Sequence, residues 1–119
     1  MLDEAVEYGR DRVAFGKPII KREVWQHKFV DMYAKVEMAK AFVYKCVDAY
    51  NDERYVKQQP LSFETVKLIS MAKIVVGDLV GEISDACLQF HGGWGYIEEY
   101  HIARAWRDQR LLRVGGVGE

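Results

Sequence analysis

A glycine-rich turn among aromatic side chains is the feature of this chain most suited to chemistry. It is the run Gln89-Phe90-His91-Gly92-Gly93-Trp94-Gly95-Tyr96. Its three glycines leave backbone N–H groups approachable, which suits a flat or phosphorylated ligand. The alternative is a left-handed stop at the end of a helix, with the aromatic side chains packed around it. A GGxG pattern by itself favours neither interpretation.

A second cluster, Arg12-Val13-Ala14-Phe15-Gly16-Lys17, places an arginine at the end of an expected helix, beside an aromatic residue and a glycine. A guanidinium fork fits phosphate oxygens, so Arg12 is a candidate anion clamp. A cation is also favoured at the negative end of the helix dipole, where it serves only as a cap. On the residues alone, capping is the favoured interpretation.

Other kinds of chemistry find no support in the sequence. The three histidines are widely separated and have no metal-ligand spacing, so we expect no metal site. Cys46 and Cys87 form no CxxC pattern or disulfide framework, and each lies in an apolar helical stripe, which indicates reduced thiols. The sequence contains no GxSxG motif, no phosphate-binding P-loop and no GxGxxG motif.

The composition limits the partners. The chain has 119 residues, half of them hydrophobic, which suits one domain with a packed core. Its 17 basic and 18 acidic residues give a net charge of -1, so neither nucleic acid nor an anionic membrane is expected as a partner. No apolar run is long enough to span a bilayer, and the N-terminus does not resemble a signal peptide.

These clusters are joined by segments with helical periodicity. We expect helices over residues 2–14, 22–51, 62–91 and 99–112, the first ended by Gly16 and Pro18. In the two long segments apolar residues recur every three or four positions. Gly77 and Gly81 indicate a close approach of a neighbouring helix. Long helices joined by short loops predict an all-α, antiparallel, up-and-down four-helix bundle over residues 1–119, and both ends look truncated.

Taken in order, these segments resemble the C-terminal helical domain of the acyl-CoA dehydrogenase family. The resemblance covers essentially the whole chain, and the ordered set of motifs is far more specific than any one of them. The sequence of the glycine turn is most similar to that of the long-chain branch of the family. The matching stretches are Arg12-x-x-Phe15-Gly16-Lys17-Pro18-Ile19, Gln26, Asp31-Met32, Met71-Ala72-Lys73, Gln89-x-x-Gly92-Gly93-x-Gly95-Tyr96, Glu99-Tyr100 and Arg107-Asp108.

The resemblance implies FAD as cofactor and a homotetramer built as a dimer of dimers. It implies α,β-dehydrogenation of an acyl-CoA thioester, with electrons passing to electron-transfer flavoprotein. By position, Arg12 matches the arginine at the FAD pyrophosphate and Phe15 the aromatic residue packed against the cofactor. Gln89 and Gly93, with the adjoining Gly92, match the part that contacts the adenine end across the dimer. The resemblance therefore reverses the interpretation of Arg12 from helix cap to anion clamp.

Three positions depart from the family pattern. Glu23 stands where a glutamine often contacts FAD, and its carboxylate would repel a pyrophosphate. Gly115 occupies the position of the glutamate base of many relatives, so the chain is expected to carry no catalytic residue. Val117 replaces a threonine that would contact FAD. Some family members also have glycine at the position of Gly115, and their base lies on a helix that precedes this segment.

The expected protein is therefore the C-terminal part of a longer enzyme, in the bacterial cytoplasm or the mitochondrial matrix. The segment alone is expected to be inactive, to retain no FAD and to self-associate. Two alternatives stay open: a catalytically silent homologue that serves oligomerisation or partner binding, and an acyl-CoA oxidase, which passes electrons to oxygen.

Overall fold

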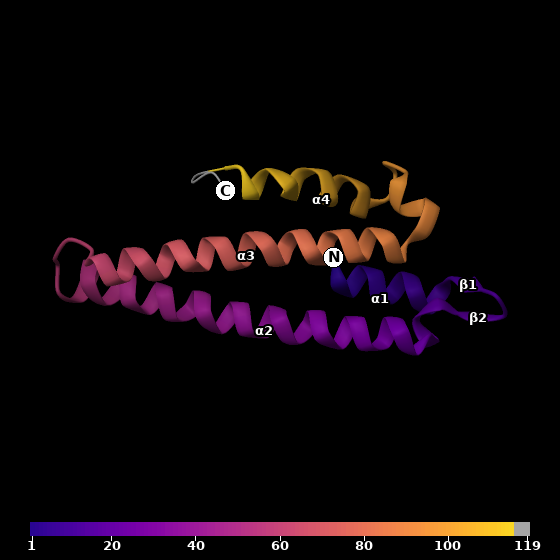
Figure 1. Ribbon diagram of the computed structural model, residues 1–119, viewed down its shortest axis with the longest axis horizontal. Coiled ribbons are helices and arrows are strands. Elements are labelled where there is room, and N and C mark those ends of the chain that lie inside the picture. Colours follow the sequence, from indigo (N-terminus) through magenta and orange to yellow (C-terminus); the bar gives the residue numbers. More distant parts are fainter. Residues whose placement is uncertain (116–119) are drawn as a thin grey trace.

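The computed structural model describes residues 1–115 and consists of four helices and one short hairpin (Figure 1). Helices that follow one another in the chain run in opposite directions, and the all-α, antiparallel, up-and-down fold class is confirmed. Gly116, Val117 and Glu119 lie outside the described residues. The elements are α1 (Leu2–Asp11), β1 (Val13–Ala14), β2 (Lys17–Pro18), α2 (Glu23–Asn51), α3 (Phe63–Phe90) and α4 (His101–Gln109).

The bundle is uneven along its length. Helices α2 and α3 form a long hairpin, and the described residues measure 61 × 24 × 20 Å. Helices α1 and α4 are short and cover only the end that lies near the β-hairpin (Figure 1). The buried core lies at that covered end, and it is made by Leu2, Ala5, Phe29, Met32, Ile83, Cys87, Phe90 and Ile102.

The other end of the α2–α3 hairpin is closed by a polar cluster. Ser62, the N-cap of α3, accepts a hydrogen bond from the Thr65 N–H at 3.2 Å, which confirms the helix start expected from the sequence. The Glu53 carboxylate accepts bonds from the Ser62 N–H at 2.7 Å, the Ser62 hydroxyl at 2.5 Å and the Thr65 hydroxyl at 2.9 Å. These bonds hold the pKa of Glu53 below its usual value, those from Ser62 being the main cause.

The first helix was expected to reach Ala14, and this prediction is wrong. Helix α1 ends at Asp11, and β1 pairs antiparallel with β2. Gly16 was expected to cap the helix but instead makes the hairpin turn, where Phe15 and Gly16 have positive φ angles of 54° and 82°. Two successive left-handed residues match the twist of a tight hairpin. Arg12 therefore lies at the junction of helix and hairpin.

The last helix is shorter than the expected range 99–112. Helix α4 begins at His101 after the extended Tyr100, and a 3₁₀ turn (Arg110–Arg113) follows its end. Glu99 therefore precedes the helix instead of lying in its first turn. The reason lies upstream, because the chain from Gly92 to Tyr96 forms its own 3₁₀ turn. Within that turn Gly95 lies against α3, and an added Cβ would fall 2.5 Å from the Leu88 carbonyl oxygen.

A very close approach of backbone to side chain occurs at a glycine that the sequence analysis did not single out. A Cβ added to Gly9 would lie 2.5 Å from Phe90 Cζ. Gly77 is buried, but at Gly81 an added Cβ would meet only Arg113 Cδ at 3.8 Å, an ordinary contact. The expected close approach is therefore not found at Gly81, and the tight packing at Gly9 is between α1 and the end of α3.

Candidate functional site

An open pocket of about 580 Å³ lies at the covered end of the bundle. It is formed where α1, the β-hairpin and the glycine turn after α3 meet. Three of the five residues expected to bind the cofactor, Arg12, Gly92 and Gly93, line this one pocket although 80 positions separate Arg12 from Gly92. The other lining residues are Tyr8, Ala14, Ile19, Phe90, His91, Trp94 and Ile97.

The backbone of Arg12 is fixed on both sides. Its N–H donates to the Tyr8 carbonyl at 2.9 Å, and its own carbonyl accepts from the Ile19 N–H at 3.0 Å. The side chain is exposed, and within residues 1–115 the guanidinium has no carboxylate partner within ion-pair distance. An arginine in this state can offer its paired N–H groups to an anion, such as a phosphate.

Electrostatics also favour a cation at this place. Helices α1 and α3 both end beside the pocket, so the carbonyl ends of two helix dipoles face this end of the bundle. An anionic ligand here needs a positive side chain to offset that field. Among the residues that line the pocket, Arg12 is the one that carries a positive charge at every physiological pH.

The two glycines of the pocket serve different purposes. Gly92 has a φ of 61°, a left-handed conformation that ends α3 and favours glycine. At Gly93 a Cβ would meet no atom within 4 Å, so neither packing nor a positive φ requires a glycine there. The space that a side chain would fill lies open to the pocket, which suits a ligand that approaches the backbone closely.

Tyr8 and His91 line the same pocket; the sequence analysis missed Tyr8 and named His91 only as part of the glycine-rich run. The Tyr8 ring stacks on the His91 imidazole, with centroids 4.3 Å apart, and the Tyr8 hydroxyl donates to the His91 carbonyl at 3.3 Å. Burial raises the pKa of Tyr8, so the hydroxyl stays a donor. His91 Nδ1 lies 2.7 Å from the Cys87 carbonyl, which places a proton on Nδ1. The available signal was that Tyr8 precedes Arg12 by one helical turn.

Phe15 and Gln89 do not line the pocket. Phe15 lies in the hairpin turn with 94% of its surface exposed. The Arg22 guanidinium lies 5.3 Å from the centre of the Phe15 ring and donates to the Ala14 carbonyl at 3.2 Å, which ties the hairpin to the start of α2. Gln89 is exposed in the last turn of α3. Glu23, the first residue of α2, is also exposed and outside the pocket.

The remaining predicted positions offer little chemistry. Gly115 is exposed after the last 3₁₀ turn, with its N–H bonded to the Leu111 carbonyl at 2.7 Å. Cys46 and Cys87 are buried and unbridged, and burial raises the pKa of Cys87 to about 11. Residues 1–115 hold no group of three or more histidine, cysteine or acidic side chains placed to bind a metal ion. Within this described part, no helix has the length and apolar character needed to cross a bilayer.

Comparison with known proteins agrees with this architecture. Residues 1–119 match the family model described as acyl-CoA dehydrogenase, C-terminal domain. The chain is 34% identical over 113 residues to the caffeyl-CoA reductase-Etf complex subunit CarC of Acetobacterium woodii, covering 95% of this chain and 27% of that protein. It is 33% identical over 120 residues to the mitochondrial long-chain specific acyl-CoA dehydrogenase of Rattus norvegicus, covering 100% of this chain and 26% of that protein.

A solved structure gives the same result in three dimensions. The acyl-CoA dehydrogenase of Bacillus anthracis complexed with FAD superimposes with a TM-score of 0.82 at 27% identity, covering 96% of this chain and 21% of that one. The chain thus spans about a quarter of the length of the curated relatives that it matches.

Proposed function

Since this chain belongs to the acyl-CoA dehydrogenase family, we propose that it is the C-terminal helical domain of a longer, flavin-dependent acyl-CoA dehydrogenase. Its role is to complete the FAD site and to hold the subunits together. One observation carries this proposal: Arg12 lies with Gly92 and Gly93 at a single pocket. A guanidinium that has no carboxylate partner within residues 1–115, and that shares a pocket with an open glycine backbone, suits the pyrophosphate of a dinucleotide.

In this proposal the chain holds FAD through a small set of residues. Arg12 binds the pyrophosphate, and Gly92 and Gly93 allow the ligand to approach the turn. FAD, when bound, supplies the two-electron oxidation that converts an acyl-CoA thioester to its α,β-unsaturated form. The chain itself contributes binding and orientation. The proton-abstracting base lies outside it, since Gly115 has no side chain that could accept a proton.

Phe15 and Gln89 act in the assembled protein. Both are exposed and outside the Arg12 pocket, so we assign them to contacts with the cofactor across a subunit boundary in a dimer of dimers. The uncovered end of α2 and α3 supports self-association, because a large apolar surface rarely stays in contact with water. Its exposed apolar side chains include Met38, Tyr44, Val47, Val66, Ile69, Ile74 and Val75.

Electron-transfer flavoprotein is the proposed electron acceptor. A relative that forms a complex with Etf supports this assignment. For the compartment, the relatives include bacterial proteins and mitochondrial ones, so we propose the bacterial cytoplasm or the mitochondrial matrix according to the source.

A catalytically silent homologue is the second candidate. Gly115 at the position of the base and Glu23 at a position that often contacts FAD favour it. In that case the same helices serve only oligomerisation or partner binding, and the complete polypeptide has no dehydrogenase activity.

The test uses the complete polypeptide under anaerobic conditions. A bound flavin that is bleached by acyl-CoA, and reoxidised by electron-transfer flavoprotein, supports the dehydrogenase. A flavin that acyl-CoA leaves unchanged supports the silent homologue. Rapid reoxidation by oxygen with release of peroxide identifies an oxidase instead. The 119-residue chain alone should purify without stoichiometric FAD.

A further inference from the structure

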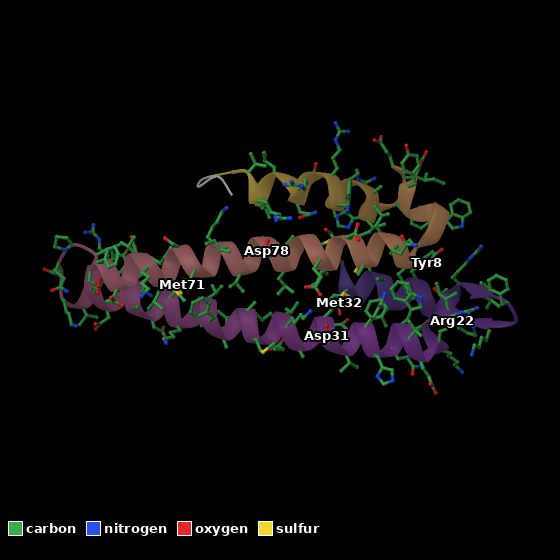
Figure 2. All side chains as sticks on the ribbon, in the orientation of Figure 1. Tyr8, Arg22, Asp31, Met32, Met71 and Asp78 are labelled. Atoms are coloured by element: carbon green, nitrogen blue, oxygen red, sulfur yellow. The ribbon has the colours of Figure 1, made fainter. Side chains whose placement is uncertain are left out.

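Tyr8 lies on α1, close to the place where α1, the hairpin and the end of α3 meet (Figure 2). It lines the pocket together with Arg12 on one side and the glycine turn on the other. We infer that Tyr8 is a positioning residue that fixes Arg12 relative to the glycine turn and so sets the distance between the two groups proposed to hold the FAD pyrophosphate. This inference rests on the proposed function.

On the arginine side, Tyr8 and Arg12 belong to one rigid unit. Tyr8 precedes Arg12 by one helical turn, and its carbonyl accepts the Arg12 N–H at 2.9 Å. The carbonyl of Arg12 in turn accepts a hydrogen bond from the Ile19 N–H at 3.0 Å. If Tyr8 moves, Arg12 is therefore expected to move with it.

On the side of the turn, Tyr8 contacts the residue that immediately precedes the glycines. Its ring lies nearly parallel to the His91 imidazole, at an interplanar angle of 26°, and its hydroxyl bonds the His91 carbonyl. Edge contacts to Phe90 and Tyr100 hold the ring from two other directions, with centroids 6.4 and 6.1 Å away. Tyr8 thus joins α1 to the C-cap of α3 and to the N-cap of α4.

The hydrogen bond from Tyr8 also satisfies a carbonyl at the end of α3, that of His91. The last carbonyls of a helix have no partner within the helix and must be satisfied by other groups. His91 is the C-cap of α3. Its imidazole Nδ1–H bonds the Cys87 carbonyl, and the Tyr8 hydroxyl bonds the carbonyl of His91 itself. Removal of the hydroxyl alone would leave the stacked rings in place and take away the one hydrogen bond that Tyr8 makes to the turn.

Tyr33 provides a matched control. Its hydroxyl donates to Asp3 Oδ1 at 2.5 Å and ties α1 to α2, so Tyr33→Phe also removes one hydroxyl bond from α1. Tyr33 is not among the residues that line the pocket. The two substitutions therefore test whether any loosening of α1 is sufficient, or whether the link to the glycine turn is required.

The experiment measures FAD affinity in the complete polypeptide with Tyr8→Phe, Tyr33→Phe, Arg12→Ala and the double variant Tyr8→Phe/Arg12→Ala. We expect Tyr8→Phe to weaken FAD binding by about threefold to tenfold, the range for loss of one hydrogen bond. Tyr33→Phe should lower the melting temperature without changing the affinity. Because Tyr8 acts through Arg12, Tyr8→Phe should cause little further loss when Arg12 is already alanine.

Unchanged affinity in Tyr8→Phe, equal losses in Tyr8→Phe and Tyr33→Phe, or fully additive losses in the double variant would each overturn the inference. Those results leave the proposed function intact, because the unmodified protein still binds FAD. If the unmodified complete polypeptide binds no FAD, the proposed function fails first.

Discussion

Gly9 of α1 and Phe90 of α3 approach so closely that a single added carbon cannot be accommodated between them. A Cβ on Gly9 would lie 2.5 Å from Phe90 Cζ and 3.1 Å from Ile20 Cβ. The Phe90 ring cannot move aside, because it is buried and packs edge-on against Trp25 and Phe29. This contact fixes the position of α1 on the core, and so the position of the pocket residues Tyr8 and Arg12.

Gly9→Ala should therefore destabilise the protein, although alanine is the better helix former. We expect a loss of about 1–3 kcal/mol, the usual cost of overpacking a core. Gly81→Ala is the control, because its Cβ would meet only Arg113 Cδ at 3.8 Å. There the gain in helix propensity should dominate, about 0.5–1 kcal/mol. Chemical denaturation of both variants measures the difference, and equal effects at the two glycines would refute the packing argument.

Arg12 should dominate the binding of the cofactor. Arg12→Ala in the complete polypeptide should weaken FAD binding by roughly tenfold to a hundredfold, as expected for loss of a charge-assisted hydrogen bond. Arg12→Lys should lose less, since it keeps the charge but not the paired N–H groups. Arg10→Ala, on the same helix but outside the pocket, is the control. Fluorescence of released flavin measures the affinities, and similar values for the Arg10 and Arg12 variants would count against the clamp.

The polar cluster at the α2–α3 turn should make stability depend on pH. The hydrogen bonds from Ser62 hold the folded-state pKa of Glu53 below its usual value of about 4.3. The stabilisation from Glu53 is therefore present above that value and is lost as the pH falls through the lower, folded-state pKa. Glu53→Gln should lower the melting temperature at neutral pH and flatten its fall in acid.

Glu64→Gln is the matched control for this experiment, because Glu64 is exposed in the first turn of α3 and outside the cluster. Its acid profile should follow that of the unmodified protein. Parallel profiles for all three proteins would show that Glu53 does not contribute to the pH dependence of stability.

Both thiols should be inert in the folded chain. Cys46 donates to the Leu68 carbonyl at 3.4 Å, and Cys87 is fully buried with its pKa raised to about 11. Thiolate is the reactive form, so little reaction with a thiol reagent is expected at neutral pH. Addition of denaturant should expose both thiols and make them react with the reagent. Rapid labelling of Cys87 without denaturant would show that this end of the bundle opens readily.

The long helices could be predicted because their signal repeats over many turns. The Ser62 cap is equally local, since its partner lies three residues away. The hairpin at Phe15 could not be read from the pattern, because a phenylalanine with positive φ gives no glycine signal at that position. The start of α4 was placed too early because the chain after Gly92 forms a separate 3₁₀ turn.

At the site, too, some residues could be predicted from the sequence and others could not. The resemblance singled out Arg12 and Gly93, which share a pocket, together with Phe15 and Gln89, which lie outside it. Tyr8 was missed because its role depends on a contact across 83 positions of sequence, which no local pattern reveals. A contact of this kind becomes visible only when α1 is seated on α3.

A crystal structure of the complete polypeptide with FAD would test the central claim most directly. The claim is that this domain completes the FAD site through Arg12 and the glycine turn. It predicts Arg12 nitrogens about 2.7–2.9 Å from pyrophosphate oxygens, with the Gly93 backbone in contact with the same ligand. An FAD whose pyrophosphate is held entirely by other parts of the protein, with Arg12 facing solvent, would contradict it.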